Sequence, residues 1–160
     1  MIRLLKNYMF ELLPFDLVPS PAEITIKEGE WGVVAYDADT KGFKFDILNN
    51  AATPTPLEAQ HLYIVLRGTK YLPSKTNEMD ANAMVTCIEP KSGLLIWTDQ
   101  FSGVIAKDDA LTVVGQTGKG AVIKTAGAED VIVGYAMNAS SLGYVVYKTA
   151  KTITLAEGSE

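Results

Sequence analysis

Residues 108 to 148 alternate short apolar, β-branched segments with glycine and small polar residues, and this pattern constrains the fold more than any other part of the chain. The apolar segments lie within 108–115, 121–124, 131–138 and 143–148. Segments of this kind at roughly ten-residue spacing, separated by turn-forming residues, are typical of small antiparallel sandwiches and barrels. We therefore predict a mainly β chain that folds as a small antiparallel β-barrel or sandwich.

The same pattern extends back to residue 23. Further strands are predicted over 22–27, 31–36, 43–48, 61–67, 84–88 and 94–97. Turn residues and prolines predict loops over 49–60 and 72–81, with a single helical turn from Pro56 to Gln60. Glu-Pro-Lys-Ser-Gly at 89–93 predicts a hairpin connection between the strands on either side of it.

The first 22 residues differ from the rest because they combine bulky apolar side chains with three prolines. Prolines disfavour both a long helix and a central strand. Apolar residues from Ile2 to Leu12 can form one face of a short helix that ends before Pro14, and an extended arm fits equally well. Such a segment must dock on its own domain, on a sister subunit or on another protein. We divide the chain into an N-terminal arm (1–22), a β-barrel domain (23–156) and a C-terminal tail (157–160).

Composition limits the partners and the chemistry. The net charge is −5, and the lysines and arginines are not clustered, so we expect neither direct nucleic-acid binding nor attachment to an anionic membrane. One cysteine, Cys87, rules out an intrachain disulfide and a multi-cysteine zinc site. Lys6 and Glu11 interrupt the apolar N-terminus, which makes it a poor signal peptide, and we expect synthesis in the cytoplasm.

Two turns resemble ligand-binding loops but lack essential residues. Gly115 to Gly120 contains glycines and Lys119, yet Gly120 stands where a phosphate loop needs serine or threonine, and a β-like segment follows where a helix should begin. Asp37 and Asp39 begin like a calcium loop, but Leu48 occupies the place of the bidentate glutamate. Both segments are better interpreted as turns, and we expect no cofactor or metal.

No catalytic motif is recognisable. A nucleophile and a base would have to come from Cys87 and the single histidine, His61. Cys87 lies in a strand-like run, where a buried, inert thiol is the usual condition. His61 heads an apolar strand and is interpreted as a structural or partly exposed residue. We therefore predict that the chain is not an enzyme.

Three segments resemble the head-decoration, or capsid cement, proteins of tailed bacteriophages. They are Ile26-Lys-Glu-Gly-Glu-Trp-Gly-Val-Val34, Thr98-Asp-Gln-Phe101, and the stretch from Gly118-Lys-Gly through Asp130-Val-Ile-Val-Gly-Tyr-Ala136 to Gly143-Tyr-Val-Val-Tyr147. The likeness covers about two thirds of the chain. In that family a turn, an apolar strand, an acidic turn and a glycine-containing strand recur near the end of the barrel.

The resemblance implies a β-tulip-like barrel that binds the outer surface of the major capsid protein lattice, often as a trimer, and stabilises the head without catalysis. The protein would then be located on the virion. Its candidate contacts to capsid or to a neighbouring subunit are apolar residues of the arm and one tryptophan that is either a core or an interface anchor. These residues are Leu4, Leu5, Tyr8, Met9, Phe10, Leu12, Leu13, Phe15 and Trp31.

A second interpretation is a receptor- or carbohydrate-binding β-module of a phage tail, because such modules are also small, acidic β-domains. They usually cluster exposed aromatic residues with carboxylates in loops. Here Tyr63, Tyr135, Tyr144 and Tyr147 lie inside strand-like runs instead. The sequence therefore favours the capsid-decoration hypothesis.

Overall fold

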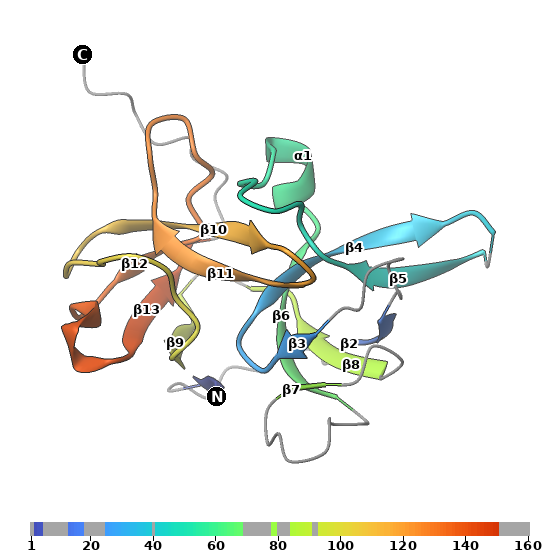
Figure 1. Ribbon diagram of the computed structural model, residues 1–160, viewed down its shortest axis with the longest axis horizontal. Helices are drawn as coiled ribbons and strands as arrows, with labels where there is room; N and C mark the ends of the chain where they lie inside the picture. The colour runs from blue at the N-terminus through green and yellow to red at the C-terminus, as the bar shows by residue number, and fades with distance from the viewer. Residues whose placement is uncertain are drawn as a thin grey trace.

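A computed structural model describes residues 2–4, 13–17, 25–39, 41–68, 78–79, 84–90 and 93–150. The protein is mainly β, and an antiparallel sheet curls into a half-barrel (Figure 1). The mainly β, barrel-like fold predicted from the sequence is confirmed.

The C-terminal half, together with the N-terminal strand, forms the curled sheet, whose C-terminal strands lie at the left of Figure 1. Its strands, in spatial order, are β1 (Ile2–Leu4), β9 (Leu95–Thr98), β13 (Val145–Thr149), β12 (Gly134–Ala136), β10 (Ala110–Gln116) and β11 (Lys119–Thr125). All neighbours in this sheet are antiparallel. Gln116 pairs with Lys119, so β10 and β11 form a tight hairpin. The four strands predicted between residues 108 and 148 are thus all present.

The remaining long strands close into a ring of five. In order around the ring they are β4 (Trp31–Asp37), β5 (Gly42–Asp46), β2 (Leu13–Leu17), β8 (Met84–Ile88) and β6 (Leu62–Gly68), which pairs back with β4. Strand direction cannot alternate all the way around an odd-numbered ring, so one neighbouring pair must be parallel. That pair is β2 and β5, and the other four pairs are antiparallel.

The short elements lie at the margins of these two units. They are β3 (Ile26–Lys27), α1 (Pro56–Ala59), β7 (Glu78–Met79) and the 3-10 turn η1 (Ser140–Leu142). Thr55 caps α1 by accepting from the Glu58 amide at 3.2 Å, while the Glu58 carboxylate accepts from the Thr55 amide at 2.9 Å. The predicted helical turn after Pro56 is therefore confirmed.

Two apolar cores result from this arrangement. The larger core lies against the inner face of the curled sheet and includes Trp31, Ile64 and Tyr147. The smaller core contains Phe45, Val65 and other residues of the ring. Strand β6 contributes alternate residues to the two cores, which explains its unbroken apolar run from Leu62 to Leu66.

The predicted hairpin between β8 and β9 is wrong. Strand β8 pairs with β2 and β6 in the ring, whereas β9 lies between β1 and β13 in the curled sheet. The Gly93 amide donates to the Thr149 carbonyl at 2.8 Å, and the Leu94 amide donates to the Thr149 hydroxyl at 3.0 Å. The segment that precedes β9 is therefore attached to β13, and turn-like composition alone did not reveal that the chain crosses between units.

The N-terminal helix considered from sequence is also wrong where the chain is described, because Ile2–Leu4 and Leu13–Leu17 are strands. Pro14 lies inside β2, although proline disfavours a central strand. Strand β5 pairs only with Asp16 and Leu17, so Pro14 has a paired neighbour on the β8 side alone. At that position β2 behaves as an edge strand, which tolerates the missing amide proton.

We expect Gly32→Ala to destabilise the ring. A Cβ atom on Gly32 overlaps the Phe45 ring and lies 2.5 Å from the Asp46 carbonyl oxygen. Overpacking against backbone should lower the free energy of unfolding by about 3 kcal/mol, measured by urea denaturation. Gly103→Ala is the control, because a methyl group there meets no atom within 4 Å and costs only about 1 kcal/mol through its positive φ. Equal losses in the two variants would contradict this explanation.

Candidate functional site

The residues predicted to form an interface fall into three groups. Trp31 is fully buried in the larger core, with its ring centroid 6.5 Å from that of Tyr147, so it is a core anchor and its prediction as an interface residue is corrected. Leu4 belongs to β1, and Leu13 and Phe15 belong to β2. The remaining candidates lie outside the described residues: Leu5, Tyr8, Met9, Phe10 and Leu12.

His61 and Cys87 do not come together. Cys87 is buried in the ring core, where burial raises the pKa of its thiol and leaves it poorly nucleophilic. Its partner on β6 is Val65, four residues and therefore about 13 Å along the strand from His61. His61 is exposed just before β6 begins. The interpretation of both residues as structural agrees with their positions.

The two turns that resemble ligand-binding loops both follow β-strands. Thr117 and Gly118 connect β10 to β11, and the residues after the turn continue as a strand instead of the helix that a phosphate loop requires. Ala38 and Asp39 form the turn after β4. Within the described ranges, no group of three or more histidine, cysteine or acidic side chains is placed to hold a metal ion.

Glu30 is a buried carboxylate that sequence reasoning missed, because it lies in a turn where exposed acids are usual. Its side chain is 2% exposed, and its Oε2 atom accepts from the Lys27 amide at 2.9 Å and from the Gly120 amide at 3.0 Å. Residue 120 must be glycine here, since a Cβ atom would lie 2.6 Å from the Glu30 Cβ. The carboxylate therefore joins the turn before β4 to strand β11.

Burial raises the pKa of Glu30 from 4.5 to about 7. Desolvation is the largest effect, and the two amide hydrogen bonds together with Lys27 and Lys119 oppose it only in part. A carboxyl group with this pKa changes charge near neutral pH. Its partners are backbone amides of its own chain, so its role is to connect structural elements.

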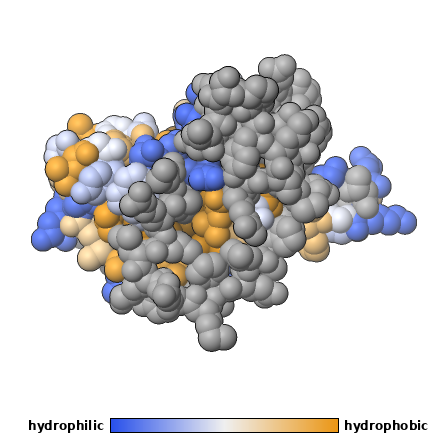
Figure 2. Space-filling model, turned by 90° about the horizontal axis from the view of Figure 1, so that it is seen from below, coloured by the Kyte–Doolittle hydropathy of each residue, from blue (hydrophilic) through white to orange (hydrophobic). Residues whose placement is uncertain are grey.

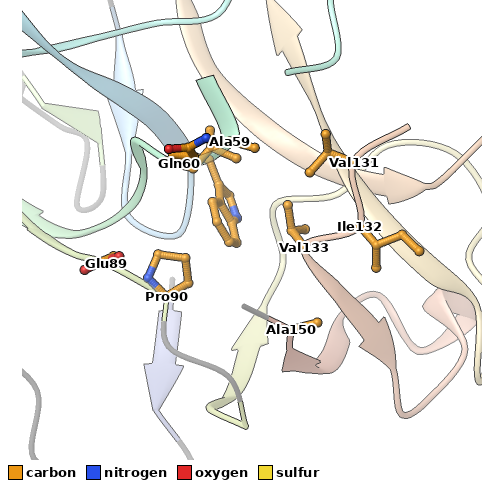
Figure 3. Close-up of a pocket in the computed structure, with 10 residues that line it drawn as sticks. Ala59, Gln60, Glu89, Pro90, Val131, Ile132, Val133 and Ala150 are labelled. Atoms are coloured by element: carbon orange, nitrogen blue, oxygen red, sulfur yellow. The ribbon is translucent and has the colours of Figure 1, made fainter. Parts of the chain in front are cut away.

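A pocket of about 280 Å³ lies between the ring and the curled sheet. Figure 3 shows Gln60, Glu89 and Pro90 on one side, facing Val133 and Ala150 on the other. Most of the lining is apolar, and Gln60 and Glu89 are the polar residues among the described residues that line it. Pockets for drug-sized ligands usually have about 300–1,000 Å³, so this pocket lies at the lower limit of that range.

A pair of exposed aromatic residues lies near the end of the β4–β5 hairpin. Tyr36 and Phe43 face each other across the two strands, are 61% and 63% exposed, and pack edge to face with centroids 5.6 Å apart at 70°. The hairpin projects from the body at the right of Figure 1. Figure 2 shows a small group of apolar atoms next to the hydrophilic end at the right of the view. Exposed aromatic side chains of this size favour a contact with another molecule.

Comparison with known proteins identifies no relative: no protein-family model, no curated protein and no solved structure matches the chain. Among the described residues, no helix is long and apolar enough to cross a membrane.

We expect Glu30→Gln to remove one source of pH dependence in stability. Because the folded pKa of about 7 exceeds the reference value of 4.5, the stabilisation from protonated Glu30 is complete below about pH 4.5 and is lost as pH rises through 7. Glutamine retains an oxygen that accepts both amide hydrogen bonds and never ionises. Relative to wild type, the variant should gain about 3 kcal/mol in free energy of unfolding between pH 4.5 and pH 8.

Urea denaturation at several pH values measures this difference. Glu129→Gln is the matched control, because it makes the same charge change at an exposed position. If Glu30→Gln and wild type lose stability in parallel from pH 4.5 to 8, the proposed role of Glu30 ionisation is wrong.

Proposed function

We propose that this chain is a structural decoration protein of a tailed-phage head. It binds the outer surface of the major capsid protein lattice, as a homo-oligomer for which we favour a trimer, and it acts without catalysis. By covering junctions between capsid subunits it adds buried area to the assembled shell. A protein that binds the assembled state in this way stabilises it by mass action.

The observation that carries this proposal is that the three segments that resemble decoration proteins meet at one place in the fold. Trp31 of the first segment pairs with Ala121 of the third. Phe101 of the second forms a bridge with Ile123, also of the third. The hydrogen bond between Glu30 and Gly120 lies at the same junction. The likeness therefore concerns a connected structural unit, the junction between ring and curled sheet.

The described surface also suits a role in assembly. Seven large apolar side chains of the described residues are exposed, and they are available for contacts with other molecules. These residues are Tyr36, Phe43, Leu57, Val104, Tyr135, Met137 and Leu142.

One observation favours the second candidate, a carbohydrate- or receptor-binding module of a phage tail. The pair formed by Tyr36 and Phe43 flanks a turn that carries Asp39, which combines exposed aromatic residues with a carboxylate. The two rings are inclined at 70°, however, and do not offer one flat platform to a sugar ring. We therefore retain this function as the alternative outcome of the binding experiment.

Purified protein mixed with expanded, DNA-free capsids of the phage that encodes it should bind until saturation, at a fixed ratio to the capsid subunit. Co-sedimentation measures the ratio of bound protein to capsid subunit. Thermal unfolding of the capsids, with and without the protein, measures the gain in capsid stability. Each occupied site should add about 2.7 kcal/mol at a protein concentration one hundred times the Kd. Binding that never saturates, or binding to a glycan array but not to capsids, would reject the decoration function.

A further inference from the structure

The outer part of the β4–β5 hairpin extends beyond the body of the protein. Strand β4 pairs with β6 only from Trp31 to Val33, and β5 pairs with β2 only at Lys44 and Phe45. Beyond these points the two strands pair with each other, through Tyr36 and Phe43, up to the turn. Two-stranded ribbons are marginally stable alone, and the edge-to-face rings help to hold this one together.

The two rings nevertheless remain mostly uncovered. At 61% and 63% exposure, Tyr36 and Phe43 offer roughly 250 Å² of surface between them. The pocket beside Trp31 has complementary properties: a volume of about 280 Å³ and a lining in which apolar residues such as Val133 and Ala150 predominate.

The hairpin cannot fill the pocket of its own chain. Trp31 lines the pocket, and Tyr36 lies five residues further along the same extended strand, about 16 Å away. Figure 1 shows that the β4–β5 hairpin projects from the body of the protein. A ring from the hairpin can therefore reach such a pocket only on a different molecule.

We propose that Tyr36 and Phe43 of one copy of this chain insert into the pocket of a second copy. The contact is head-to-tail, because hairpin and pocket are different surfaces. Repeated contacts of this kind give a closed ring where the rotation between subunits closes and an open filament where it does not, and the proposal is the closed ring. The rings provide much less than the roughly 800 Å² per partner of a standard interface, so one contact does not hold a dimer. In a closed ring each subunit gives one hairpin and receives another. This inference rests on the proposed homo-oligomer and identifies its contact.

Disulfide cross-linking tests the contact directly. Phe43→Cys protein is mixed with Ala59→Cys protein, whose new thiol lies in the wall of the pocket, and the mixture is oxidised with copper–phenanthroline. We expect a mixed dimer at about tenfold the yield obtained with Thr117→Cys in place of Phe43→Cys, because docking raises the effective concentration of the two thiols. Thr117 is an exposed turn residue between β10 and β11, and the buried Cys87 thiol contributes little background.

The yields of cross-linked dimer show whether the hairpin of one copy contacts the pocket or the hairpin of another copy. If Phe43→Cys alone cross-links to itself as efficiently as the mixture, the hairpins pack against each other and the proposal is wrong. Equal yields from the Phe43→Cys and Thr117→Cys mixtures would overturn it as well.

Sedimentation velocity gives an independent test. Wild-type protein should sediment as a closed oligomer, and both the double variant Tyr36→Ser/Phe43→Ser and the pocket-filling variant Ala59→Trp should sediment as monomers, with circular dichroism confirming that they fold. A monomeric wild type, or variants that remain oligomeric, would overturn the inference. Oligomers that form this contact but never bind capsids would reject the decoration function alone.

Discussion

The fold depends on the shared strand β4, which connects the ring and the curled sheet. Its first residue, Trp31, pairs with Ile64 in the ring and with Ala121 on strand β11. The indole side chain is buried in the larger core. Because the same backbone belongs to both units, the pairing of β11 determines where the curled sheet lies against the ring, and the pocket between the two units follows from that placement.

Burial on both sides of the ring wall accounts for several local features of the sequence. Strand β6 is apolar on both faces, since one face belongs to the ring core and the other to the larger core. Gly32 lies against the ring of Phe45, which fills the space that a side chain at this position of β4 would need. Glu30 is desolvated at the same junction and remains there because two backbone amides donate to it. Packing thus determines the residue type at each of these positions.

The outer hairpin differs from the rest because nothing in the described chain covers it. Towards the body, β4 and β5 are flanked by β6 and β2, and their side chains fill the ring. Towards the turn they lose these neighbours, and apolar residues on them must meet solvent or another molecule. The proposed contact between copies depends on this exposed surface and on the pocket beside Trp31.

Local sequence patterns determined the elements. Period-two alternation and turn residues predicted β10 to β13, the tight turn at Gly118 and the strand that begins at Trp31, because strand formation and turn conformation depend mainly on neighbouring residues. Tertiary structure alone decided which strands pair, and with it that the 89–93 connection crosses between units and that Pro14 is accommodated within a strand. It also decided that Trp31 and Glu30 are buried while Tyr36 and Phe43 are exposed. These features depend on contacts between residues far apart in the chain, such as Glu30 and Gly120, which no local pattern records.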